Sequence, residues 1–283
     1  MPPINVIPIL CDLMFVAQKK VLPVGWSQPT GEGGKQYPDA FKKNELAVPP
    51  VPLCYFWCAS VNKYHVDQCK DVGKQFKDFA HAMLDAFKFS HDMWRLQAKF
   101  KDLKVMAVCA IGTPGCLDGP ELESNMKNAP QTASFSGNMA KWRDACAAGI
   151  SKCFKEWQSK VMVPGLPWYP AFAAFPGPMA PPMPNIPMPL ITCPSPMMAK
   201  MTPKMLQGAM LDAFSLDDPD KQFDAMALSL ATPIAIGFLI WLASQQIMLV
   251  MGKGPIPTFA PPYVPVGPVV GGDNIPAPGH LIA

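Results

Sequence analysis

Proline is concentrated in three stretches of this chain, and this distribution limits what the chain can fold into. Of its 35 prolines, nine lie in residues 1–52, thirteen between Pro164 and Pro203, and eight between Pro255 and Pro278. Proline fixes φ, lacks a backbone donor and pushes the preceding residue toward extended geometry. We therefore expect the three stretches to be extended straps rather than helices or central strands.

The central stretch differs from an ordinary linker because large apolar side chains stand between its prolines. Residues 163–191 read VPGLPWYPAFAAFPGPMAPPMPNIPMPLI. Such a segment is stiff and apolar but has no internal hydrogen bonds, so it needs a surface on which to lie. We predict that partner subunits provide this surface. The predicted partner contacts are Trp168, Tyr169, Phe172, Phe175, Met183 and Met188.

Two amphipathic patterns predict a helical hairpin between the first two straps. From near Asn62, apolar residues recur at alternating spacings of three and four over roughly forty residues, with lysines and aspartates on the other faces. A loop rich in Gly, Pro, Asn and Ser follows, from about Gly112 to Gly137. A second apolar seam then runs from Met139 to about Met162. Two such helices joined by one loop should pack antiparallel.

The uncharged stretch from Ala225 to Met251 predicts an apolar helix, for which Asp218 is a candidate cap and Gly252 a candidate C-terminal stop. It is long enough to cross a bilayer, but Pro233 and the polar residues 244–246 favour burial in protein. The residues that we single out on this helix are Phe238, Leu239, Trp241, Leu242 and Met248.

The fold predicted from these patterns is mainly α: a long antiparallel helical hairpin or bundle with extensive proline-rich extended arms. Its predicted divisions are an N-terminal strap (1–59), the hairpin (60–163), a proline, methionine and aromatic strap (164–203), C-terminal helices (204–252) and a C-terminal strap (253–283).

Composition gives little support to catalysis, metal binding or nucleic-acid binding. The net charge of +3 is spread rather than clustered, whereas a nucleic-acid site needs a basic stripe. An odd number of cysteines, nine, favours reduced thiols in the cytosol. His65, Cys69, Cys54 and Cys58 could be named as zinc ligands, but their spacing matches no recognised finger. We expect no cofactor, no metal, no nucleic acid and no enzymatic activity.

Two histidine pairs, His81 with Asp85 and His91 with Arg95, have the four-residue spacing of one helix face. Such pairs are ordinary on solvated helix surfaces. None of the standard phosphate-binding, nucleophile-elbow or metalloprotease motifs occurs in the chain.

The favoured interpretation is a non-enzymatic structural subunit of a large assembly, whose arms strap neighbouring subunits, including copies of itself. Among assemblies we prefer a tailed-phage virion (tail, baseplate or neck) assembled in the host cytoplasm, which is a class-level analogy. The alternative is a protein anchored in or inserted into a membrane by the apolar helix 234–251. A third hypothesis, a scaffold for modules that bind P-x-x-P, uses the spacing of Pro164, Pro167 and Pro170.

Overall fold

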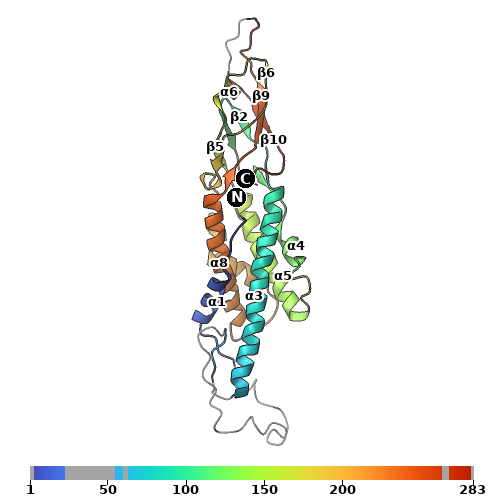
Figure 1. Cartoon of the computed structure of the whole chain (residues 1–283), viewed down its shortest axis with the longest axis vertical. Helices are drawn as coiled ribbons and strands as arrows, with labels where there is room; N and C mark the ends of the chain where they lie inside the picture. Colours follow the sequence, from blue (N-terminus) through green and yellow to red (C-terminus); the bar gives the residue numbers. More distant parts are fainter. Residues whose placement is uncertain (1–2, 23–54, 60–62, 263–267, 282–283) are drawn as a thin grey trace, which may run out of the picture.

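The computed structural model describes residues 3–22, 55–59, 63–262 and 268–281. The molecule is a long rod with helices in one part and a β-sheet at the end beyond them (Figure 1). Both described chain ends lie near the junction of the two parts. Most of the predicted N-terminal strap, residues 23–54, lies outside the described residues.

Seven α-helices occur in the part of the chain that the structure describes. They are α1 (Pro8–Ala17), α3 (Lys63–Gln97), α4 (Leu122–Lys127), α5 (Gly137–Gln158), α6 (Pro170–Ala173), α7 (Pro203–Asp212) and α8 (Gln222–Ser244). Two short 3₁₀ helices, η3 (Leu190–Thr192) and η4 (Met198–Met201), lie before α7.

The helical part has an aromatic core. Trp94 on α3 packs edge-to-face on Phe154 of α5, with ring centroids 4.8 Å apart, and its indole N–H donates to Gln158 Oε1 over 2.8 Å. Trp157 meets Phe238 of α8 at 4.8 Å. Helices α3, α5 and α8 therefore share one core, with α4 packed against both α3 and α5.

Glycines allow close backbone approach at two helix contacts. A Cβ on Gly149 of α5 would lie 2.5 Å from the backbone nitrogen of Met210 in α7. A Cβ on Gly237 of α8 would lie 2.6 Å from the carbonyl oxygen of Asn5, so the N-terminal segment runs directly over α8. Any larger residue at either position would force the two backbones apart.

A six-stranded antiparallel sheet, of order β5-β3-β2-β10-β9-β6, forms the other part. Its strands are β2 (Lys104–Met106), β3 (Cys109–Gly112), β5 (Val163–Pro167), β6 (Met179–Pro184), β9 (Met251–Pro255) and β10 (Gly272–Ile275). Two small ladders, β1 (Lys99–Phe100) with β4 (Leu117–Asp118) and β7 (Met188–Pro189) with β8 (Gln246–Ile247), lie outside it.

Buried polar side chains hold the C-terminal segment in place. Asn274 Oδ1 accepts from the Leu103 N–H over 2.9 Å, while its amide nitrogen donates to the Phe100 carbonyl over 2.8 Å. The Phe100 N–H donates in turn to His280 Nδ1 over 2.9 Å. Because these side-chain atoms of Asn274 and His280 bond to the backbone of residues 100 and 103, the C-terminal segment is part of the fold.

The mainly-α fold predicted from the sequence is wrong. The structure is mixed, with 49% helix and 16% strand, and the proline-rich segments supply strands of the sheet instead of free arms. Prolines are accommodated because β5 and β6 are the outer strands and because Pro181 and Pro182 lie where the β6–β9 register shifts. In addition, β10 contains no proline.

The long helix predicted from near Asn62 is confirmed, since α3 begins at Lys63. The helix predicted to run to Met251 ends at Ser244, and the residues after it form β8 and β9. Asp218 does cap this helix, since its carboxylate accepts from the N–H groups of Gln222 and Asp224. Gly252, predicted as a helix stop, lies in the middle of β9.

Candidate interaction surface

The six-stranded sheet is rolled, so that its two outer strands meet. Trp168, just after β5, forms an antiparallel bridge with Asn185, just after β6, and the Ile186 N–H donates to the Pro167 carbonyl over 2.8 Å. The indole N–H of Trp168 donates to the Met183 carbonyl over 2.9 Å. A sheet joined in this way presents less unpaired edge than an open one.

Several small residues face the inside of the rolled sheet. The buried strand positions include Ala110, Ala180, Gly252, Gly254 and Gly272. A Cβ on Gly254 would lie 2.6 Å from the Cα of Gly272, and one on Gly252 would lie 2.8 Å from the indole ring of Trp168. Val105 and Leu166 are buried strand residues as well, so close backbone contacts, aliphatic side chains and the Trp168 ring fill the interior together.

Large apolar side chains also lie on the outside of this sheet. Met106 is 59% exposed, Met179 54% and Tyr169 51%, and Val108 and Val270 are also exposed. These five residues come from β2, the β2–β3 turn, the segment before α6, β6 and the β9–β10 connection. Because those segments surround the sheet, the exposed apolar groups are not confined to one side of it.

The only charged side chains in the six strands form one row across β2, β10 and β9. Lys104 pairs in register with Asp273, which pairs with Lys253, and Lys104 Nζ lies 3.0 Å from Asp273 Oδ1. Beyond this row, away from the helices, lie residues 105–110, 168–182, 254–262 and 268–272, which we name the uncharged tip. No Asp, Glu, Lys, Arg or His occurs among them.

The uncharged tip is also poor in polar groups of any kind. Its side-chain hydroxyls are those of Tyr169 and Thr258, and it contains no Ser, Asn or Gln. Prolines occupy ten of its positions, and each removes a backbone N–H that would otherwise need an acceptor. The tip therefore offers few hydrogen bonds to whatever covers it.

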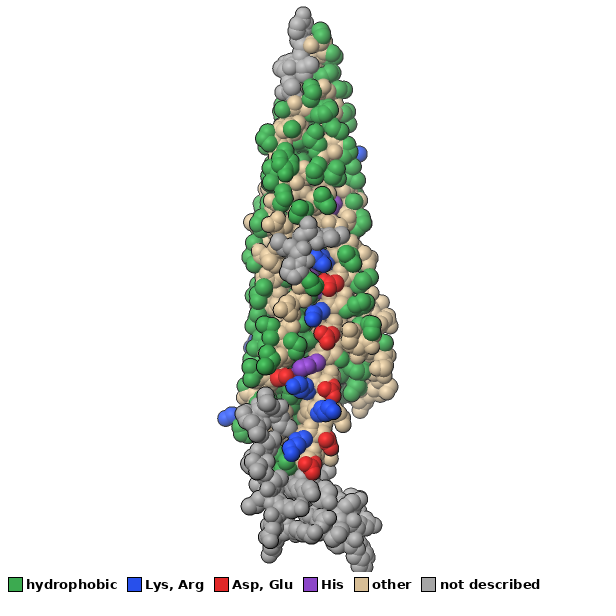
Figure 2. All heavy atoms as spheres, in the orientation of Figure 1, with side chains coloured by type: hydrophobic (Ala, Val, Ile, Leu, Met, Phe, Trp, Pro, Cys, Tyr) green, Lys and Arg blue, Asp and Glu red, His purple; other side chains and the backbone are tan. Residues whose placement is uncertain are grey.

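Figure 2 shows that the sheet end and the helical part differ in their surface side chains. Apolar side chains cover the sheet end, whereas in the helical part lysines and aspartates follow α3, with apolar side chains on both sides of that row. The pairs on α3 are loose, with Lys70–Asp67 at 3.9 Å and Lys88–Asp85 at 3.7 Å. Exposed pairs of this kind keep a surface hydrated and contribute little to stability.

The predicted partner-contact residues occupy different environments. Trp168 and Phe172 are buried in the chain's own core, whereas Tyr169 points outward and is exposed. Phe175, Met183 and Met188 are partly buried and pack against the core. Contact of these six residues with partner subunits stays a prediction, and Tyr169 is the one among them whose side chain is mostly free.

The residues singled out on the apolar helix are also divided. Phe238, Trp241 and Leu242 are buried among the core aromatics, Leu239 is exposed, and Met248 lies beyond the end of α8 and is partly buried. Among the described residues α8 is the one helix long and apolar enough to cross a bilayer, yet 72% of its apolar window is buried inside the protein. The core helix of a soluble protein meets the same criterion.

A polar cluster joins α1 to α3. The Asp12 carboxylate accepts from Tyr55 Oη over 2.7 Å, pairs with His81 Nε2 at 2.9 Å and lies 3.1 Å from Lys77 Nζ. Burial raises the pKa of Asp12, but these three partners outweigh it and hold the pKa below its ordinary value. His81 thus pairs with Asp12 and not with Asp85, as its helix spacing had suggested.

His91, expected on a solvated face, is instead fully buried. Its ring lies 4.4 Å from that of Trp241, and burial followed by the charge of Arg95 lowers its pKa to about 3. Neither ring nitrogen has a hydrogen-bond partner within the described residues. The neutral imidazole therefore serves as a core ring.

The cysteines of the described residues form no disulfide with one another, and most of them are buried. Burial raises the pKa of Cys193 to about 12 and that of Cys116 to about 11, so neither is a thiolate at neutral pH. Of the zinc candidates, His65 Nε2 lies 3.6 Å from Cys69 Sγ and also accepts from the Ala59 N–H, while Cys54 lies outside the described residues. No group of three or more possible metal ligands is found in the described part of the chain.

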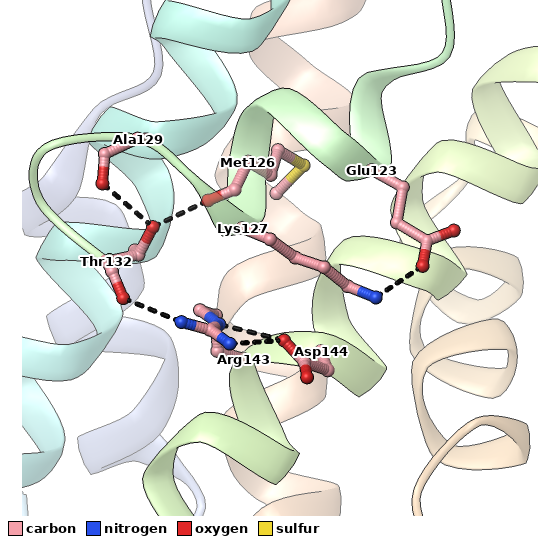
Figure 3. A network of polar contacts seen from close by, with 7 residues as sticks. All are labelled: Glu123, Met126, Lys127, Ala129, Thr132, Arg143 and Asp144. Atoms are coloured by element: carbon pink, nitrogen blue, oxygen red, sulfur yellow. Dashed lines mark hydrogen bonds and ion pairs between the residues drawn. The ribbon is translucent and has the colours of Figure 1, made fainter. Parts of the chain in front are cut away.

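A further polar network, drawn in Figure 3, fixes the turn between α4 and α5. Thr132 Oγ1 donates to the Met126 carbonyl, and the Thr132 carbonyl accepts from Arg143 Nη1 over 3.0 Å. Arg143 also pairs with Asp144 at 2.8 Å. These groups are hydrogen-bond or ion-pair partners of one another and of the backbone, so their role is structural.

An apolar hollow of about 240 Å³ lies between α3, α5 and α8, far from the sheet. Its walls include Phe76, Phe79, Trp142 and Phe223, with Gln75 as one of the few polar groups. It contains no titratable side chain.

Comparison of the chain with protein-family models, with curated proteins and with solved structures finds no match. The surface must therefore be interpreted from its own chemistry.

The uncharged tip was not anticipated from the sequence as one surface. Its signal is present, because the chain carries no Asp, Glu, Lys or Arg in residues 105–117, 161–199 and 254–272. What the sequence did not show is that these three stretches lie together at one end of the molecule. Strand pairing between residues distant in sequence brings them there.

Proposed function

We propose that this chain is a non-enzymatic structural subunit of a multi-subunit assembly, and that its uncharged tip is a surface that becomes covered there. The observation that supports this proposal best is the arrangement of Met106, Tyr169 and Met179, which are more than half exposed on different sides of a charge-free end. Apolar groups grouped in this way are characteristic of surfaces that become covered.

The assembly that we propose is a virion of a tailed phage, in its tail, baseplate or neck. Its support is the sequence-level analogy, together with buried neutral thiols such as Cys146, whose pKa burial raises well above the ordinary value. A membrane anchor in residues 234–251, of which only those up to Ser244 belong to α8, is the weaker candidate, because the outward apolar residues of α8 are limited to a stripe that includes Ile236, Leu239 and Ile240.

The proposal is tested by the protein composition of intact particles. We expect quantitative mass spectrometry of particles purified from the producing cells to find this chain at a fixed copy number relative to the other subunits, and to find it retained after a high-salt wash. A chain that stays in the soluble cell fraction, or whose copy number varies from one preparation to the next, would contradict a structural role.

A further inference from the structure

We propose that the uncharged tip inserts into the apolar region of a lipid monolayer. This inference rests on the proposed function and specifies what the tip contacts. Three observations carry it, and each concerns a property that distinguishes contact with hydrocarbon from contact with another protein.

The first observation is the exposure of large apolar side chains on the outside of the sheet. Met106 and Met179 face outward, while Gly252, Gly254 and Ala180 face inward beside buried aliphatic side chains. The outward face of a strand in water is usually polar. Large apolar groups pointing outward are what a lipid environment favours.

The second observation concerns hydrogen bonds. Protein interfaces carry roughly one hydrogen bond per 100–200 Å² and a polar rim. The tip has only the Tyr169 and Thr258 hydroxyls to contribute, besides its thiol at Cys109. In hydrocarbon an unpaired backbone N–H is costly. Pairing of strands around the rolled sheet and ten prolines in the tip both reduce the number of such groups.

The third observation is the sharp limit of the uncharged surface. Lys104, Asp273 and Lys253 stand side by side across three strands, and every described strand residue beyond them is uncharged. Charged groups of this kind are tolerated at the headgroup level but not in the acyl region. In β6 only Met179–Pro182 lie beyond the row, because Met183 and Pro184 pair with Gly252 and Met251 on the helix side of Lys253. These residues span roughly 13 Å, so the tip enters one leaflet of a core about 30 Å thick and does not cross it.

Contact all around the tip also favours lipid over a second copy of the chain. A copy docked on one side would cover some of the exposed residues but leave those on the opposite strands in water. A fluid apolar phase covers all of them at once.

The test uses the purified full chain and vesicles of neutral phosphatidylcholine, separated by flotation in a density gradient. We expect the same fraction of the wild-type chain to float with the vesicles at about 0.1 M and at about 0.5 M salt, because charge attraction plays no part. Met106→Asp and Met179→Asp should each lower the bound fraction at least about tenfold.

The matched control is Met205→Asp, which places the same charge on an exposed methionine of α7 in the helical part. It should bind vesicles as the wild type does. All three positions are exposed, so the variants should fold, and equal thermal unfolding curves will verify that they do.

Three outcomes would overturn the proposal. The first is a wild-type chain that remains at the bottom of the gradient, and the second is equal loss of binding in Met205→Asp and in the tip variants. The third is self-association without lipid that Met106→Asp and Met179→Asp abolish, which would identify a second copy as the occupant. None of these results bears on the copy number of the chain in purified particles, so failure of the lipid inference and failure of the structural role can be distinguished.

Discussion

The two parts of this molecule differ in where they place charge. In the helical part, rings such as Trp94, Phe154 and Phe238 fill the inside, and the outside carries charged residues as well as exposed apolar ones. In the sheet part, glycines share the inside with aliphatic side chains, and Met106 and Met179 lie outside, on an end without charge. The comparison indicates that the helical part is stabilised by its own core, whereas the sheet part keeps apolar surface for another phase or molecule.

The largest effect is expected from removing a ring of the helical core. Phe154 contacts Trp94, Trp157 and Phe238 and has no polar group to satisfy. Phe154→Ala should lower the free energy of unfolding by about 3–5 kcal/mol, measured by urea denaturation. Phe89→Ala, at an exposed position of α3, is the control and should change it by less than about 1 kcal/mol. Similar losses in both variants would disprove the aromatic core.

A smaller effect is expected from adding one methyl group inside the sheet. In Gly254→Ala the new Cβ would lie 2.6 Å from the Cα of Gly272, which is backbone and cannot turn away. The free energy of unfolding should fall by about 1–3 kcal/mol. Gly208→Ala on α7 meets nothing within 4 Å and should instead raise it by up to about 1 kcal/mol. If Gly254→Ala were neutral, the interior would be wider than described.

The polar cluster on α1 predicts a pH dependence confined to the helical part. The pKa of Asp12 is lowered in the folded chain, so its contribution to stability is present above the ordinary carboxyl pKa of about 3.9 and is lost as the pH falls through the folded value. The difference in urea midpoint between wild type and Asp12→Asn should therefore shrink below about pH 4. Asp85→Asn, at the exposed and loose pair with Lys88, is the matched control and should change the free energy of unfolding by less than about 1 kcal/mol.

The smallest effect on stability is expected at the charged row of the sheet. Lys104 and Asp273 are exposed, with side chains 74% and 58% accessible. Lys104→Gln should change the free energy of unfolding by less than about 1 kcal/mol, and this change should stay below that value when salt is added. A larger loss of stability, measured by thermal unfolding, would mean that the row holds the strands together. It would then not serve only as the limit of the apolar surface.

The sequence allowed the helical part to be predicted better than the sheet. The three-and-four spacing around Phe79 and Met83 specifies α3 locally, and the short-range signals for α5 are of the same kind. The sheet depends on pairs such as Asp273 with Lys104, which are far apart in the chain and leave no local pattern. Proline content argued against strands there, and that inference overlooked outer strands and register shifts, where a missing N–H is tolerated.

The candidate surface was predicted only in part for a similar reason. The sequence drew attention to the strap that carries Tyr169 and to its apolar character, but it did not distinguish inward from outward side chains. Trp168 and Tyr169 are neighbours in sequence, yet one fills the rolled sheet and the other is exposed. That distinction follows from how the sheet closes.

The most direct test of lipid contact at the uncharged tip is hydrogen exchange of the full chain with and without phosphatidylcholine vesicles. We predict that vesicles slow amide exchange in residues 105–110, 168–182 and 254–262 and leave the charged face of α3, residues 67–78, unchanged. Slowing on α3, or no slowing in the tip while the chain is bound to vesicles, would contradict the account.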